Sequence, residues 1–236
     1  MSPADEAFQI RQTKIGLRLS QHGVVLSELR TSPGPTHSVF DVLAAVVARL
    51  APAGRIGILG FAGGGMLAPL RGLGVETAID SMDLERAGYD LFRQHCHRWA
   101  GQVNWQQQDA AEWLRQEPRD FGVLVDDLSV PANGDVIKPA ITWDVLPELI
   151  RDRLVPGGVG VFNLLVPPSG AWLPALTRIA SLFKTAHVIE LDEFENRILI
   201  GGDQLPAARE CGVQLRLTLR QVRSRHATRI QLRSLR

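Results

Sequence analysis

The stretch Arg55-Ile-Gly-Ile-Leu-Gly-Phe-Ala-Gly-Gly-Gly-Met66 decides the fold of this chain. Its apolar run, Ile56 to Leu59, predicts a buried strand, and the run ends in a glycine-dense turn over residues 60–65. A helix-compatible segment follows. Glycines in such a turn adopt positive φ at little cost and let the backbone approach a ligand closely. The turn and the start of the next helix would then offer free N–H groups to a polar ligand.

An acid closes the next apolar run. Val75 to Ile79 predicts a second strand, and Asp80 ends it. A glycine turn after one strand and an acid at the end of the next are typical of a nucleotide or nucleoside site, where the acid accepts hydrogen bonds from ribose hydroxyls. The pattern therefore indicates that the protein binds a nucleotide or nucleoside cofactor, but it does not identify the reaction.

The chain of 236 residues suits one domain with appendages, and its 45% hydrophobic and 22% charged content is ordinary for a globular protein. Two cysteines, Cys96 and Cys211, make no disulfide framework and show no metal-ligand spacing. Residues 1–9 hold two acids and no apolar core, which argues against a signal peptide. No run reaches membrane-spanning length without a charge. We expect a cytoplasmic protein without a bound metal.

The net charge of +1 is unevenly spread. Residues 211–236 hold seven of the 26 basic residues and no acid, so residues 1–210 hold 19 basic against 25 acidic residues. This arginine-rich tail could bind an acidic partner, nucleic acid, or the acidic body of its own or a neighbouring subunit. The alternation of apolar and polar residues from Val213 to Arg220 favours a simpler interpretation, a strand with a solvated arginine face. With one Tyr in the chain and no aromatic residues among these arginines, nucleic-acid binding is not expected.

The chain between the two ends alternates strand and helix patterns. Residues 9–30 predict a hairpin, and Val39 to Leu50 predicts a helix that Thr36 or Ser38 caps. Further strands are expected at Ile56–Leu59, Val75–Asp80, Val103–Gln106, Val123–Val125 and Val159–Leu165, and helices at Met66–Leu73, Leu84–Trp99, Ala110–Gln116, Ala140–Leu154 and Trp172–Phe183. Strands Ala186–Leu191 and Arg197–Gly201 leave no room for a helix between them and should be antiparallel neighbours.

These patterns predict an α/β fold with a doubly wound, mostly parallel, seven-stranded sheet and helices on both faces. We expect an N-terminal β-hairpin extension over residues 1–35, a nucleoside-binding α/β domain over residues 36–210 and a basic extension over residues 211–236. Ligands in such sheets bind at the carboxyl ends of the strands. That rule selects the glycine turn, Asp80, Asp109 and the pair Asp126-Asp127. Each acid alone could be a cap or a turn residue, but the set beside the glycine turn indicates a functional site.

The order of these motifs resembles the spermidine synthase group, which are polyamine aminopropyltransferases within the S-adenosylmethionine-dependent methyltransferase fold class. The resemblance covers about residues 10–205 and rests on Ile58-Leu-Gly-Phe-Ala-Gly-Gly-Gly65, Ala78-Ile-Asp80, Gln108-Asp-Ala110, Phe121-Gly-Val-Leu-Val-Asp-Asp-Leu-Ser-Val-Pro131 and Leu154-Val-Pro-Gly-Gly-Val-Gly-Val-Phe-Asn163. It implies the class I methyltransferase-like Rossmann fold preceded by a hairpin.

The resemblance also implies roles on the cofactor side. The family's G-G-G-D-G-G turn embraces the nucleoside, and here Gly63 stands in the place of its aspartate. Asp80 would hold the ribose hydroxyls, and Asp109, with Ala110 beside it, would accept from the adenine amino group, since carboxylates make strong hydrogen bonds. The implied cofactor contacts are therefore Gly60, Ala62, Gly64, Gly65, Asp80, Asp109 and Ala110.

The catalytic segment of the family reads D-x-x-D-P. Asp127 matches its first aspartate, which would deprotonate the attacking amine, while Val130 stands in place of the second and Asp126 is an additional neighbour. The family's G-x-x-Q reads Gly23-Val-Val-Leu26, and its Y-H-E or Y-Q-E reads Thr36-His37-Ser38. Acidic and polar groups are thus missing on the substrate side, while most cofactor-side positions are retained.

Two further residues are substrate-side candidates. His37 could act as an acid or base because its ordinary pKa lies near neutrality, or it could pack at the helix start. Trp143 and Trp172 could each line the substrate pocket or fill the core, and the pocket is the favoured interpretation for Trp143 only. The resemblance implies a homodimeric transferase that binds S-adenosylmethionine or its decarboxylated form and moves a methyl or aminopropyl group to a small acceptor, an amine among the candidates. The alternative is a non-catalytic nucleoside-binding or assembly module of the same fold that uses the arginine-rich tail.

Overall fold

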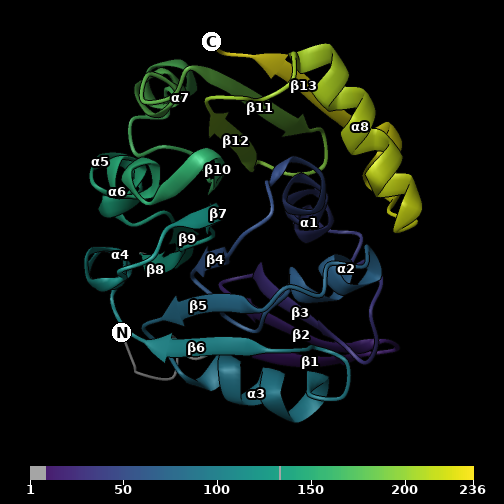
Figure 1. The fold of residues 1–236 in the computed structure, drawn as a ribbon. Coiled ribbons are helices and arrows are strands. Elements are labelled where there is room, and N and C mark those ends of the chain that lie inside the picture. The colour runs from purple at the N-terminus through teal and green to yellow at the C-terminus, as the bar shows by residue number, and fades with distance from the viewer. Residues whose placement is uncertain (1–8, 133) are drawn as a thin grey trace.

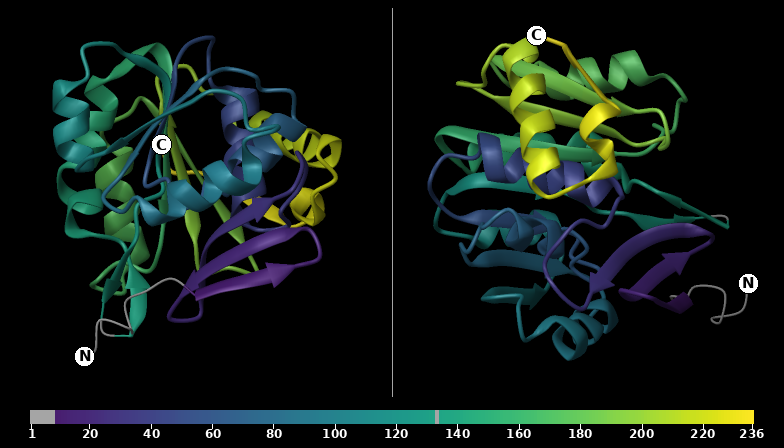
Figure 2. Two further views of the ribbon diagram at one scale, coloured as in Figure 1. Left: turned by 90° about the horizontal axis from the view of Figure 1, so that it is seen from below. Right: turned by 90° about the vertical axis from the view of Figure 1, so that its right-hand side faces the viewer.

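The structure is a computed structural model that describes residues 9–132 and 134–236. Residues 1–8, where the sequence argues against a signal peptide, lie outside the described residues. The chain begins with a small antiparallel sheet of β1 (Gln9–Thr13), β2 (Gly16–Gln21) and β3 (Val24–Arg30). The predicted hairpin is confirmed, with β1 as a third strand. Figure 2 shows this sheet in purple, projecting from one side of the molecule.

A central sheet of eight strands carries the rest of the chain, in the order β13-β11-β12-β10-β7-β4-β5-β6. The five strands from β10 to β6 are parallel, and β12, β11 and β13 pair antiparallel. Their bounds are β4 (Ile56–Leu59), β5 (Ile79–Asp83), β6 (Val103–Gln107), β7 (Phe121–Asp126), β10 (Leu154–Leu164), β11 (Thr185–Leu191), β12 (Arg197–Gly202) and β13 (Ile230–Ser234). The doubly wound, mostly parallel fold is therefore confirmed, as is the antiparallel pairing of β11 with β12.

Helices cover both faces of this sheet (Figure 1). One face packs against α1 (Val39–Leu50), α2 (Leu67–Gly72), α3 (Ala87–Cys96) and α8 (Ala208–Gln221), and the other against α4 (Ala110–Gln116), α6 (Leu146–Asp152) and α7 (Trp172–Ala180). The strands serve both faces because successive side chains alternate: Val161 of β10 joins the first core and Phe162 the second. Ser38 caps α1 by accepting a hydrogen bond from the Phe40 backbone N–H, as predicted.

The arginine-rich tail differs from its prediction. The stretch that was predicted to be a strand belongs to α8, because Cys211, Leu215 and Leu219 are buried at helical spacing against the α1 side. The chain then enters the central sheet as β13, which makes eight strands in place of the predicted seven. Arginines of this segment pair within the molecule: Arg225 and Arg229 bind Glu193, and Arg233 binds Glu190. The tail is therefore packed against the body of the fold.

Two other predicted elements change. The helix expected over residues 140–154 is broken into α5 (Ala140–Asp144) and α6, because Pro147 fits only the first turn of a helix. The loop expected after β7 contains a hairpin, β8 (Val130–Ala132) and β9 (Asp135–Ile137). None of the helices within the described residues combines the length and the apolar character that crossing a membrane requires.

Candidate functional site

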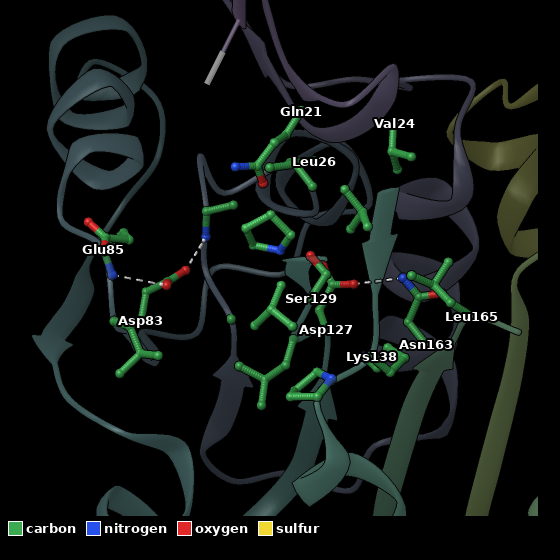
Figure 3. Close-up of a pocket in the computed structure, with 18 of the residues that line it drawn as sticks. Gln21, Val24, Leu26, Asp83, Glu85, Asp127, Ser129, Lys138, Asn163 and Leu165 are labelled. Atoms are coloured by element: carbon green, nitrogen blue, oxygen red, sulfur yellow. Dashed lines mark hydrogen bonds between the residues drawn. The ribbon is translucent and has the colours of Figure 1, made fainter. Parts of the chain in front are cut away.

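A cavity of about 950 Å³ opens at the carboxyl ends of the parallel strands. Residues that follow β4, β5, β6 and β7 line it, together with the end of β10, and the β2–β3 turn closes it from the opposite side. Figure 3 shows Gln21 and Leu26 of the small sheet facing Asp83 and Asp127 across this space. The rule that ligands bind at this edge of a parallel sheet therefore locates the cavity correctly.

The glycine turn forms the back of the cavity. Gly60 (φ 85°) and Ala62 (φ 44°) line it in left-handed conformations. A Cβ at Gly60 would lie 2.9 Å from backbone atoms of Asp127, so this position requires glycine. Gly64 and Gly65, also predicted to meet the cofactor, do not line the cavity, because a Cβ at either would face phenylalanine rings of the core.

Gly63 occupies the place of the family's aspartate. A Cβ there would lie 2.6 Å from Cδ1 of Leu29 and 3.0 Å from Cδ1 of Leu19, two buried residues of the small sheet. Oγ of Ser27 also lies 3.0 Å from this Cβ, so any side chain here would clash with the small sheet unless these neighbours moved. Packing between the small sheet and the turn therefore accounts for a glycine at this position.

The acid at the end of the second strand is Asp83, not Asp80. The strand runs from Ile79 to Asp83, three residues beyond its predicted end. Asp80 lies outside the cavity near the amino ends of the strands, where Oδ2 accepts from Nε of Arg55 and Oδ1 from Nδ2 of Asn104, both at 2.8 Å. Its position therefore supports a structural role, and the acid of this strand that lines the cavity is Asp83 in place of the predicted Asp80.

Asp83 supports the glycine turn as well as lining the cavity. Its Oδ2 accepts from the backbone N–H of Ala62 at 2.7 Å, and its Oδ1 accepts from that of Glu85 at 3.2 Å (Figure 3). Glu85 also lines the cavity. A carboxylate has about four acceptor positions, so Asp83 can hold both backbone groups and still accept from a ligand hydroxyl.

Asp109 and Ala110 both line the cavity, and their contact with a cofactor stays a prediction. Asp109 is the N-cap of α4, where its Oδ1 accepts from the backbone N–H groups of Ala111 and Glu112 at 2.9 and 3.0 Å. Within the described residues Oδ2 has no hydrogen bond. The capping role and a ligand contact thus use different oxygens of the same carboxylate.

Asp127 is the carboxylate of the cavity next to β10. Its Oδ1 accepts a 2.6 Å hydrogen bond from Nδ2 of Asn163, and its backbone N–H donates to the Leu59 carbonyl at 2.8 Å. Burial is the largest influence and raises the pKa of Asp127 to about 6, while Lys138 and the Asn163 hydrogen bond act in the opposite direction. At neutral pH Asp127 is therefore mostly ionised and remains a useful base.

Asp126, the second predicted catalytic candidate, lies outside the cavity. It is fully buried, and its Oδ1 accepts from Nζ of Lys138 at 3.1 Å and from the Leu128 backbone N–H at 3.0 Å. The β8–β9 hairpin brings Lys138, itself 3% exposed, to this position. The ion pair fixes the loop after β7, which carries Asp127. Asp126 therefore has a structural role.

The two substrate-side candidates also lie outside the cavity. The backbone N–H of His37 donates to Asp41 at 3.0 Å, and its Nδ1 accepts from the Arg225 backbone N–H at 3.4 Å, which ties the start of α1 to the C-terminal segment. Trp143 of α5 packs against the core on the α4 and α6 side. Trp172 stacks under Arg197 beside a second hollow. Among residues 9–132 and 134–236 no three His, Cys, Asp or Glu side chains gather as metal ligands would.

Sequence reasoning missed three site residues: Asp83, Asn163 and Lys138. Asp83 was hidden because the apolar run stops at Asp80, although the strand continues through small and polar residues. Asn163 was visible as a polar residue at the end of the apolar run before it, but nothing local links it to Asp127. Lys138 depends on a hairpin that is two strands of three residues, too short for a periodic pattern.

No protein-family model and no curated protein sequence matches the chain. Solved structures are similar to it in fold. Human methyltransferase-like protein 13 in complex with SAH has a TM-score of 0.60 and 17% identity, covering 79% of this chain and 90% of that one. Spermidine synthase from Thermotoga maritima has a TM-score of 0.64 and 15% identity, covering 85% and 70%. A spermidine synthase in complex with the transition state analogue AdoDATO has a TM-score of 0.66 and 16% identity, covering 85% and 71%. The chain thus has the methyltransferase-like Rossmann fold that these proteins share.

Proposed function

We propose that this protein is a transferase that binds S-adenosylmethionine or its decarboxylated form and transfers a methyl or aminopropyl group to a small acceptor. One observation carries the proposal. Three adjacent parallel strands, β4, β5 and β6, present the glycine turn, Asp83 and Asp109 to one cavity, and Asp127 follows the neighbouring β7. The fold shared with a protein bound to SAH and one bound to AdoDATO supports it.

The residues of the cavity fit an adenosine group. Asp83 can accept from vicinal ribose hydroxyls, and Oδ2 of Asp109 can accept from the adenine amino group. Met82 and Leu84, which flank Asp83 in the chain, line the cavity with apolar surface for the purine. A cavity of about 950 Å³ also leaves room for an acceptor beside the nucleoside.

The chemistry divides between the ligand and the chain. A bound sulfonium nucleoside would supply a carbon that the adjacent positive sulfur activates for displacement. Asp127 would accept the proton of the attacking group, and Asn163 would hold the carboxylate in a fixed orientation. The rest of the site contributes positioning and exclusion of water, which supply much of the rate in displacements of this kind.

Calorimetric titration with S-adenosylmethionine, its decarboxylated form and methylthioadenosine tests the proposal. We expect micromolar binding of at least one, with the preference between the first two deciding between methyl and aminopropyl transfer. Asp109→Asn is the matched variant, because asparagine still caps α4 but presents an N–H group to the adenine amine. It should weaken binding about tenfold. Folded protein that binds none of the three would overturn the proposal.

The alternative function, a non-catalytic module that recruits an acidic partner through residues 211–236, has less support. Three arginines of that segment bind Glu190 and Glu193 within the chain, and β13 completes the central sheet. These contacts favour an intramolecular role for the tail. The homodimer remains a prediction.

A further inference from the structure

The half of the cavity next to β10 is lined mainly by apolar side chains. Its polar residues are Asp127, Asn163 and Asn196, with Ser129, Gln21 of the small sheet and Lys138, whose ammonium group is bound to Asp126. The other side chains of its wall are hydrophobic and come from the small sheet, the β8–β9 hairpin and the segments after β10 and β11. Leu26, Val130, Ile141, Leu165 and Phe194 belong to this set. Under the proposed function the nucleoside lies over β4, β5 and β6, so the acceptor occupies this apolar half.

Asp127 is the carboxylate available to an acceptor there. The other acids of the cavity, Asp83, Glu85 and Asp109, follow β5 and β6. Neighbouring strands are about 4.8 Å apart, so β5 lies about 10 Å and β6 about 14 Å from β7, on the side of the cavity that the proposed nucleoside fills. Asp126 offers no charge either, because Lys138 neutralises it where both side chains are almost wholly buried.

A second hollow adjoins the cavity and contains Glu190, Asp192 and Glu195. Glu190 is neutralised by Arg197 and Arg233, and Asp192 and Glu195 are exposed to water. These acids therefore provide no buried partner for a cation inside the cavity.

This distribution of charge decides which acceptors the site can hold. One ammonium group can pair with Asp127, but a second would have to leave water for a mainly apolar wall without another free carboxylate, which is unfavourable. A hydrocarbon body gains free energy from the same wall. We propose that the acceptor is an apolar molecule with a single amino group, and that di- and polyamines are excluded. This inference rests on the proposed function, since it assumes that the nucleoside fills the other half.

The test compares two amines of equal length. Protein saturated with methylthioadenosine is titrated by calorimetry with hexylamine and with 1,6-diaminohexane. Hexylamine should bind at least tenfold more tightly. From butylamine to hexylamine each added methylene should tighten the Kd up to about fourfold, the equivalent of about 0.8 kcal/mol. Equal or tighter binding of the diamine, or no binding of either amine at millimolar concentration, would overturn the inference.

A matched pair of variants tests whether the missing carboxylate is the reason that diamines bind weakly. Val130→Asp places a carboxylate on the apolar wall, and Val130→Asn adds a side chain of the same shape without charge. The aspartate variant should bind 1,6-diaminohexane at least tenfold more tightly than the asparagine variant does. Methylthioadenosine affinity is read separately: if it is retained while the amine preference is absent, the acceptor class is wrong and the proposed function stands. If methylthioadenosine does not bind even the wild-type protein, the proposed function fails and the acceptor inference fails with it.

Discussion

Asn163 donates a 2.6 Å hydrogen bond from Nδ2 to Oδ1 of Asp127, and its own Oδ1 accepts from Nδ2 of Asn196 at 2.9 Å. The second bond fixes the orientation of the Asn163 amide, because only Nδ2 can then face the carboxylate. A residue of β10 and one from the loop before β12 thereby orient the proposed base. This hydrogen-bond relay, Asn196–Asn163–Asp127, connects the antiparallel strands of the sheet with the cavity at the ends of its parallel strands.

Asn163→Ala should shift the pH dependence of the transfer reaction. Without the donor the ionised form of Asp127 loses a hydrogen bond, so the pKa of Asp127 rises above its value of about 6. The acid limb of the pH–rate profile should move upward by about one pH unit. Asn196→Ala, which removes only the outer bond of the relay, should move it less. An unchanged acid limb in Asn163→Ala would show that Asp127 is not the titrating base.

Asp127→Asn should stabilise the protein while removing activity. The folded-state pKa of about 6 lies above the ordinary value of 3.8, so between these pH values the folded protein holds a proton that the unfolded chain has lost. The free energy of unfolding of the wild type therefore falls as pH rises from about 4 to about 6. The asparagine of the variant does not titrate, so its free energy of unfolding does not fall in this way.

Urea denaturation measures the effect of Asp127→Asn. The variant should be more stable by about 1–2 kcal/mol at pH 8 and equal to the wild type near pH 4, with partial solvent access reducing the gain. Its transfer activity should fall at least about a hundredfold, the usual contribution of a general base. A variant that is less stable than the wild type at pH 8 would contradict a desolvated carboxylate at this position.

The sequence predicted the centre of the fold better than its boundaries. Ile56–Leu59 and Ala110–Gln116 match β4 and α4, because a buried apolar run and a capped helix are both local signals. The end of β5 was misplaced because a strand buried by its neighbours tolerates Asp80 and Ser81, which local propensity reads as a turn. Residues 213–220 fit both strand and helix spacing, and packing against α1 decided between them. The Asn163–Asp127 contact joins residues 36 positions apart, beyond the reach of any local pattern.

Asp83→Asn and Asp80→Asn separate the cofactor acid from the structural acid. Asp83→Asn should weaken methylthioadenosine binding at least tenfold, because it removes a carboxylate acceptor from the cavity and disturbs the bond to the Ala62 backbone N–H. Asp80→Asn should leave that affinity unchanged and lower the free energy of unfolding by about 1 kcal/mol through its weakened bond to Arg55. Calorimetry and urea denaturation of both variants measure the two effects. The reverse pattern would restore the ribose role to Asp80.

Lys138→Met should be the most destabilising of these changes. It leaves Asp126 without its cation at a site where the Asp126 side chain has 0% exposure, and breaking a buried pair in this way costs about 3–5 kcal/mol. The double variant Asp126→Asn/Lys138→Met removes both charges and should recover most of the loss, as measured by urea denaturation. Lys138 lowers the pKa of Asp127 more than the Asp126 charge raises it, so the acid limb of the pH–rate profile should still move upward, by a reduced amount, in the double variant, which remains folded. A Lys138→Met protein as stable as the wild type would show that the pair with Asp126 does not fix the loop that carries Asp127.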